Sequence, residues 1–171
     1  TLAAKFVEVF KRDPRHGYAG RFQEFLKSVG DGAEFLARIR PHSDKSGAAM
    51  RACPVGVLPD LAEVLARTRV QAAITHNTPD GIEAACAAAL MPHYFIHGHG
   101  PRADLGRFLC EHVRGDWATP WAGPVGARGR MSVRAAITAV VAGHSMSDVL
   151  SRCVEFTGDV DTVATIALAT G

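Results

Sequence analysis

The sequence predicts an all-α protein, a compact domain in which several helices cross at large angles or pack as a bundle. Two observations support this prediction. Every segment with a clear pattern spaces its apolar residues about 3.6 positions apart, as on one face of a helix. No run alternates apolar and polar residues in the way that marks a half-buried strand. The length of 171 residues suits one domain with a sizeable core, so we expect a single domain over residues 1–171.

The start of the chain predicts three short helices. Residues 2–10 place their large apolar side chains on one stripe, and the Asp-Pro pair at 13–14 ends this helix because proline disfavours helical backbone at the preceding residue. Residues 21–29 form a second amphipathic helix, which the Gly-Asp-Gly sequence at 30–32 stops. A short helix that contains Phe35, Leu36 and Ile39 continues the pattern.

The remainder of the chain predicts five helices before the last one, at residues 58–73, 79–90, 105–113, 133–142 and 147–154. Pro79 opens the second of these, since proline suits the first helical turn. Ser132 is expected to cap the fourth. This fourth helix is rich in alanine and valine, and we expect it to be the most deeply buried.

Composition excludes several function classes. The net charge is +2, and the 19 basic residues are dispersed rather than gathered in a stripe, which argues against a nucleic-acid partner. No apolar run approaches the ~20 residues of a membrane span, and the N-terminus lacks the layout of a signal peptide. We therefore expect a cytoplasmic protein without a membrane partner.

The cysteines have no close-paired spacing of the kind that zinc sites use. Each lies in an apolar neighbourhood, so buried free thiols in a reducing compartment are expected for Cys53, Cys86, Cys110 and Cys153. His93, His97 and His99 stand beside Gly98 and Gly100, and the pattern favours surface residues on a mobile connection over a metal site. Trp117 and Trp121 either pin a loop to the core, which we favour, or flank a ligand.

The most distinctive stretch is Thr-Gly-Asp-Val-Asp-Thr at residues 157–162, which leads into an apolar run. Asp159, Asp161 and Thr162 place two carboxylates and a hydroxyl at the start of a helix. Oxygen ligands set this closely suit a hard divalent cation such as Mg²⁺. Helix capping explains the same acidic residues without a metal, since acidic side chains are favoured at helix N-termini.

Two further stretches have two interpretations each. Residues 46–50, from Ser46 to Met50, contain small side chains that permit close approach, either of a diphosphate to backbone N–H groups or of one helix to another. His76 follows a predicted helix, where histidine serves as a capping residue or as part of a site. The residues by themselves favour helix packing and capping.

The three stretches 46–56, 75–82 and 158–162 occur in the order and rough spacing of the ADP-ribosylglycohydrolase family, which the chain resembles along nearly its whole length. The resemblance implies that family's compact, orthogonal multi-helix fold. It also implies a hydrolase that removes ADP-ribose from a modified protein side chain or a small molecule, using two Mg²⁺ or Mn²⁺ ions. By the same resemblance, Asp159 and Asp161 are catalytic and, with Thr162, ligate metal, while the substrate is bound by Ser46, Gly47, Ala48, Met50 and His76.

The chain also departs from the family's pattern. A Thr-Asp-Asp-Thr segment that forms the other metal half-site is not found, and the sequence stops within the helix that the acidic stretch begins. We therefore expect the chain to lack the family's N-terminal metal-binding segment and its C-terminal end. Val160 replaces a usual threonine and Ser46 a usual asparagine. A non-catalytic relative, either an ADP-ribose-binding module or a crystallin-like structural protein, remains the alternative.

Overall fold

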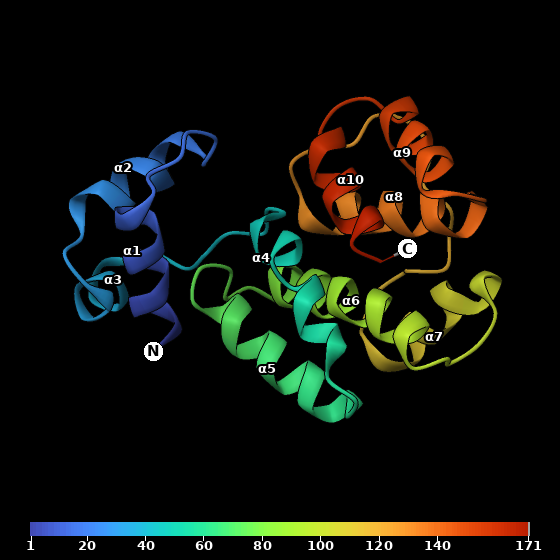
Figure 1. Ribbon diagram of the computed structural model, residues 1–171, viewed down its shortest axis with the longest axis horizontal. Helices are drawn as coiled ribbons and strands as arrows, with labels where there is room; N and C mark the ends of the chain where they lie inside the picture. The colour runs from blue at the N-terminus through green and yellow to red at the C-terminus, as the bar shows by residue number, and fades with distance from the viewer. Residues whose placement is uncertain (171) are drawn as a thin grey trace. The chain divides into compact units, whose positions relative to one another are not determined.

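The computed structural model describes residues 1–170, and no strand occurs among them, so the prediction of an all-α protein is confirmed. The chain divides into two compact units, Thr1–Pro41 and His42–Gly171 (Figure 1). The single domain over residues 1–171 stays a prediction. None of the helices in residues 1–170 combines the length and apolar composition needed to span a bilayer.

The first unit is built on aromatic contacts between three helices, α1 (Leu2–Arg12), α2 (Gly20–Ser28) and α3 (Gly32–Arg38). Phe35 is fully buried, and the Phe25 ring meets it edge-on with 5.1 Å between ring centroids. Phe6 and Phe22 also pack edge-on against Phe35, at 6.3 and 6.4 Å. This cluster lets helices of 7 to 11 residues, which are marginal alone, hold together.

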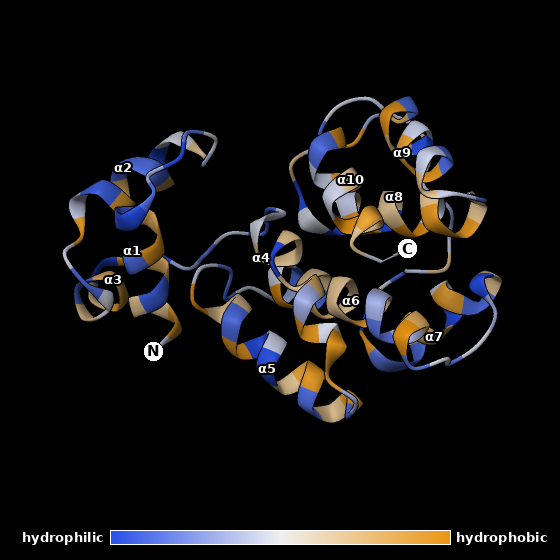
Figure 2. Cartoon of the chain, in the orientation of Figure 1, coloured by the Kyte–Doolittle hydropathy of each residue, from blue (hydrophilic) through white to orange (hydrophobic). Residues whose placement is uncertain are grey.

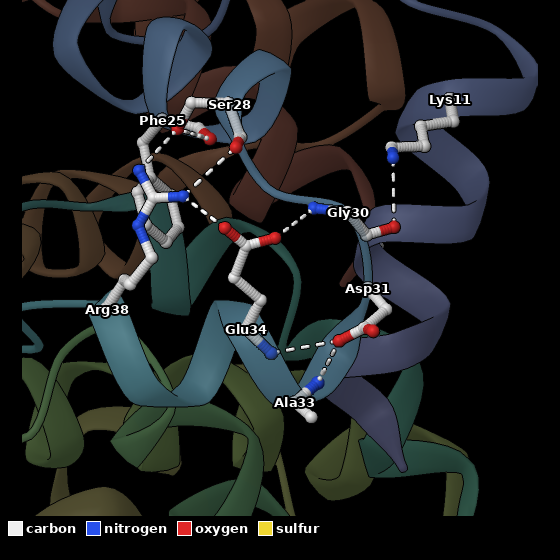
Figure 3. A network of polar contacts seen from close by, with 8 residues as sticks. All are labelled: Lys11, Phe25, Ser28, Gly30, Asp31, Ala33, Glu34 and Arg38. Carbon is white, nitrogen blue, oxygen red and sulfur yellow. Dashed lines mark hydrogen bonds and ion pairs between the residues drawn. The ribbon is translucent and has the colours of Figure 1, made fainter.

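The start of α3 is fixed by charged side chains, as Figure 3 shows. Asp31 caps the helix, because one of its carboxylate oxygens accepts hydrogen bonds from the Ala33 and Glu34 amides at 2.8 and 2.9 Å. Glu34 accepts from the Gly30 amide at 2.6 Å and pairs with Arg38, and these contacts lower the pKa of Glu34. Arg38 also donates to the Ser28 carbonyl and hydroxyl, which links α3 to the end of α2.

The second unit contains the remaining helices. In chain order they are α4 (Gly47–Met50), the 3-10 helix η1 (Cys53–Val57), α5 (Leu61–Ala73), α6 (Pro79–Ile96), the 3-10 helix η2 (Arg102–Asp104), α7 (Leu105–His112), α8 (Gly129–Ala142), α9 (Met146–Glu155) and α10 (Val160–Leu168). Blue and orange segments alternate along α5 and α9 in Figure 2, as expected for helices with one exposed and one buried face.

Helix α6 forms the centre of the second unit, with α4, α5, η1, α7 and α8 all in contact with it (Figure 1). Residues 84–94 are buried on every side of the helix, which is typical of a fully enclosed helix. Our prediction that the helix at 133–142 is the most deeply buried was wrong. The unbroken alanine run at 87–89 allows neighbours to approach α6 from all directions, whereas α8 keeps a partly exposed face.

Several predicted helix boundaries were also wrong. The helix predicted from residue 58 begins at Leu61, where Asp60 caps it, and the chain before it forms η1. Helix α8 begins at Gly129, so Ser132 lies inside it, fully buried, and does not cap it. Helix α9 begins at Met146, because the Ser145 hydroxyl accepts from the Asp148 amide.

The structure changes the interpretation of some polar residues. His93, predicted to lie at the surface, is fully buried because it stands on the enclosed part of α6, while His99 is exposed. Cys53, Cys86 and Cys153 are buried as predicted, but Cys110 lies on the solvent face of α7. Trp117 is buried and donates from its indole nitrogen to the Val113 carbonyl at 3.0 Å, which confirms the core interpretation for this residue. Trp121 is only partly buried.

A strained turn delivers the chain to α10. Thr157 and Gly158 both have left-handed backbone, with φ of 61° and 80°. Val125, in the loop before α8, pairs with this turn: its amide donates to the Thr157 carbonyl at 3.1 Å, and its carbonyl accepts from the Asp159 amide at 2.9 Å. A Cβ on Gly158 would lie 2.1 Å from the Val125 carbonyl oxygen, so only glycine fits here.

We predict that Gly158→Ala destabilises the protein and displaces Asp159. The left-handed backbone alone costs a side chain about 1–2 kcal/mol, and relief of the overlap with Val125 adds a cost of order 1–3 kcal/mol. The measurement is the free energy of unfolding in urea.

Gly123→Ala is the matched control. Gly123 has a similar φ of 85°, but the space around its would-be Cβ is open. The free energy of unfolding of this variant should therefore fall only by the cost of placing a side chain on left-handed backbone. Equal losses in the two variants would show that the contact with Val125 does not constrain the turn.

Candidate functional site

The two carboxylates of the acidic stretch lie at the start of α10. Asp159 occupies the N-cap position, yet its side chain accepts no hydrogen bond from the helix backbone. Its Oδ1 instead accepts from the Thr162 hydroxyl at 3.0 Å. Helix capping by the Asp159 side chain, the interpretation that needs no metal, is therefore not what the structure contains.

The carboxyl group of Asp159 stands in an unfavourable place for a lone negative charge. Burial raises its pKa, and the neighbouring Asp161 carboxyl raises it further, while hydrogen bonds from Thr162 and Ser46 act in the opposite direction. Asp161 itself is exposed. Two carboxylates this close repel each other unless a proton or a cation lies between them.

Helix α4 brings residues 46–50 to these carboxylates. Ser46 is buried at the start of α4, near enough for its hydroxyl to lower the pKa of Asp159. At the other end of α4, the Met50 sulfur lies 3.6 Å from the Thr162 hydroxyl. Thus Ser46, Met50, Asp159 and Thr162 meet, although more than 100 residues separate Met50 from Thr162 along the chain.

Arg51 anchors this short helix, a role that the sequence analysis did not predict. Its guanidinium donates to the Gly47 carbonyl at 3.2 Å, to the side chain and carbonyl of Gln71 at 2.7 and 3.0 Å, and to the Thr75 hydroxyl at 2.6 Å. Burial lowers the pKa of Arg51 to about 10, which leaves it charged at neutral pH. The signal was available, since arginine follows the Gly-Ala-Ala-Met sequence that we singled out.

His76 lies against the other side of α4. A Cβ on Gly47 would lie 3.3 and 3.5 Å from Cε1 and Nε2 of the His76 ring. His76 is buried, and burial followed by the charge of Arg51 lowers its pKa to about 4, so the ring is neutral at pH 7. The Thr75 hydroxyl, 2.6 Å from Nδ1, receives a bond from Arg51 and can donate its own hydrogen to Nδ1. The ring proton then sits on Nε2, where it can be donated to a ligand.

The loop that leads into α4 is held from two sides. The Thr78 hydroxyl donates to the Ser43 carbonyl at 3.2 Å, and the backbone of His42 pairs with that of His76. On the other side, the Gly129 amide donates to the Asp44 carbonyl at 2.9 Å. The Ser46 backbone is therefore placed by both α6 and α8, and its position does not depend on α4 alone.

A metal ion fits this set of donors in part. Asp159, Asp161 and Thr162 present carboxylate and hydroxyl oxygens, the ligands that Mg²⁺ and Mn²⁺ prefer. Over residues 1–170, however, no three histidine, cysteine, aspartate or glutamate side chains converge in the arrangement of a complete metal site. Mg²⁺ takes about six oxygens, so further ligands have to come from water or from elsewhere.

The predicted substrate residues divide into two groups. Ser46, Gly47, Met50 and His76 are brought together around α4, as the geometry above describes. Ala48 is fully buried, and its carbonyl accepts from the Gln71 side chain at 3.2 Å. Ala48 therefore has no exposed surface through which a ligand can reach it.

Comparison with known proteins gives a consistent result. The family model described as ADP-ribosylglycohydrolase matches residues 1–170. A protein from Xenopus tropicalis, ADP-ribosylhydrolase ARH3, is 26% identical over 123 residues, which cover 66% of this chain and 35% of the relative. A solved structure titled ADP-ribosylglycohydrolase-related protein complex is also similar, with a TM-score of 0.69 and 21% identity. The match covers 98% of this chain and 60% of the chain in that structure.

The similarity to the solved structure confirms the expected multi-helix fold. The chain spans about a third of the length of the curated relative and three fifths of the length of the chain in that structure. Because the family model covers the described chain from its first residue to residue 170, the match does not rest on one motif. The chain belongs to the ADP-ribosylglycohydrolase family.

Proposed function

We propose that this chain is part of a hydrolase that releases ADP-ribose from a modified protein side chain or a small molecule by metal-assisted cleavage of the glycosidic bond. One observation carries the proposal. Asp159 and Thr162 on α10 meet Ser46 and Met50 of the α4 segment, with His76 packed on Gly47. The stretches that the family resemblance singles out thus converge in space.

Asp159, Asp161 and Thr162 would hold one Mg²⁺ or Mn²⁺, with a second ion in the complete family site. Bound there, the cation would neutralise the paired carboxylates and fix oxygen atoms of the ribose and of the attacking water. The missing backbone cap supports this assignment, because it leaves the Asp159 carboxylate free of the helix amides and available for a cation.

The substrate side would be formed by Ser46, Gly47, Met50 and His76, whereas Ala48, predicted with them, is fully buried. The backbone amides at the start of α4 face the same end as Ser46 and can donate to a diphosphate. His76, neutral and carrying its proton on Nε2, can donate to a ribose hydroxyl. Cleavage of a glycosidic bond builds positive charge on the sugar ring, and a carboxylate of Asp159 or Asp161, or the metal, would activate the attacking water.

A non-catalytic relative, which binds ADP-ribose or serves a structural purpose, is the alternative. The retention of Asp159, Asp161 and Thr162 favours the enzyme, since a binding module has no need of paired carboxylates in a partly buried place. Hydrolysis by the full-length protein, and its loss on mutation of Asp161, would separate these classes.

We predict that Asp161→Ala in the full-length protein abolishes binding of the divalent cation and hydrolysis while the fold stays intact. Asp161 is exposed, and its loss removes one charge at a helix start, which costs about 1 kcal/mol or less. Calorimetric titration with Mg²⁺ measures the affinity, and urea unfolding measures the stability.

Glu155→Ala is the control for that experiment, because it removes an exposed acidic side chain from the neighbouring helix α9. It should bind Mg²⁺ as the unmodified protein does. An unchanged Mg²⁺ affinity in the Asp161 variant would remove the metal role from this residue.

We also predict that the 171-residue chain is catalytically silent toward ADP-ribosylated substrates even with Mg²⁺ or Mn²⁺ supplied. Three side-chain oxygen donors hold a hard cation weakly, because it needs about six oxygens presented together. Weak binding of ADP-ribose can persist, since Ser46 and His76 lie within the chain. An ADP-ribose release assay beside the full-length protein tests this, and robust turnover by the chain would show that these donors are sufficient.

A further inference from the structure

Three histidines gather where α6 ends. His93 lies on the last turns of α6, His97 is its C-cap, and His99 follows in the turn between Gly98 and Gly100. The ring centroids of His93 and His97 are 4.5 Å apart, those of His93 and His99 are 4.9 Å apart, and those of His97 and His99 are 6.5 Å apart. This cluster belongs to the second unit and is not part of the site described above.

The surroundings of His93 fix which of its nitrogens is free. Nδ1 lies 3.0 Å from the Leu58 carbonyl oxygen and 3.2 Å from that of Gly56. A carbonyl oxygen can only accept, so Nδ1 must carry the hydrogen and donate it. Nε2 then carries a lone pair and no hydrogen, within a side chain that is fully buried.

The free nitrogen of His93 has no protein partner. Among the described residues, Nε2 of His93 and Nε2 of His97 are both buried and lack a hydrogen-bond partner. A buried nitrogen without a partner costs free energy, so two such nitrogens on adjacent turns require an explanation. Histidines that bind metal show this same arrangement, in which one nitrogen donates to a carbonyl and the other is left for the ion.

The spacing of the rings agrees with a shared ion. His93 and His97 stand four residues apart, the spacing at which two histidines of a helix ligate one zinc ion. A Zn–N bond of about 2.0–2.1 Å to each ring places the ring centroids roughly 5 Å apart at tetrahedral angles. The observed separations of 4.5 to 6.5 Å lie around this value.

We propose that His93, His97 and His99 form a binding site for one first-row transition-metal ion of the borderline class, such as Zn²⁺, distinct from the carboxylate site of α10. Imidazole nitrogen suits Zn²⁺, Cu²⁺ or Ni²⁺ and not Mg²⁺. With three imidazoles and a water molecule, the coordination of a four-coordinate zinc ion is complete.

Binding requires a small rearrangement. No three ligand side chains within residues 1–170 converge on one point as they stand, so the rings have to rotate. The terminal torsion of histidine is broad, and His99 is exposed between two glycines with left-handed backbone, φ of 65° and 158°. His93 is already held by the carbonyls of Gly56 and Leu58, so the ion would join the turn after α6 to the end of η1.

The test is titration of the untagged 171-residue chain with Zn²⁺ against a chromogenic chelator, with bound Co²⁺ observed by its visible absorption. We expect one ion per chain and a rise in melting temperature with Zn²⁺, because the ion binds the folded state. His97→Gln and His99→Gln should each weaken Zn²⁺ binding at least about tenfold. His93→Gln is avoided as the main test because its ring supports buried carbonyls.

His144→Gln is the matched control, since His144 is an exposed histidine of the same unit outside the cluster. It should bind Zn²⁺ as the unmodified chain does, and so should Asp161→Ala, so that this proposal and the magnesium site can fail separately. Circular dichroism confirms that each variant is folded. If the unmodified chain binds no Zn²⁺, or if His97→Gln and His99→Gln both keep its affinity, the site is overturned and water satisfies the buried nitrogens.

Discussion

The packing of the second unit depends on how closely the other helices can approach α6. The alanine side chains of this helix are short, and two of the elements that pack on it, η1 and α8, do so through glycine. A Cβ on Gly56 of η1 would lie 2.3 Å from the Ala89 carbonyl oxygen, and one on Gly129 of α8 would lie 3.1 Å from Cβ of Ala84. The packing therefore fixes positions through backbone contact, which leaves little freedom to slide.

The candidate site follows from that packing. Helix α4 has only four residues and cannot define its own orientation, so its place comes from outside. The Arg51 guanidinium ties its carbonyls to α5, while the loop before it is held by Thr78 at the start of α6 and by Gly129 at the start of α8. The carboxylates are positioned from a third direction, by the pairing of Val125 with the turn at Gly158. The positions of Ser46 and Asp159 thus depend on four helices at once.

The two proposed ion sites differ in their chemistry. At α10, paired carboxylates and a hydroxyl offer oxygen, and the electrostatic cost is repulsion between like charges. At the end of α6, histidine nitrogens offer neutral lone pairs, and the cost is desolvation without a hydrogen bond. Hard cations such as Mg²⁺ prefer the oxygen ligands, and borderline cations such as Zn²⁺ prefer the imidazole nitrogens.

The sequence by itself determined the fold class and the residues of the candidate site, because helical periodicity and short motifs are local properties. It placed Asp159, Asp161 and Thr162 at a helix start, where the structure also has them. The burial of a residue, in contrast, is not a local property of the sequence. Whether α6 or α8 is enclosed depends on how many elements pack on each, so His93 was predicted at the surface and Ser132 at a helix cap, both wrongly. The role of Arg51 and the contact of Met50 with Thr162 came only from tertiary structure, since they join residues distant in the chain through hydrogen bonds that no periodicity encodes.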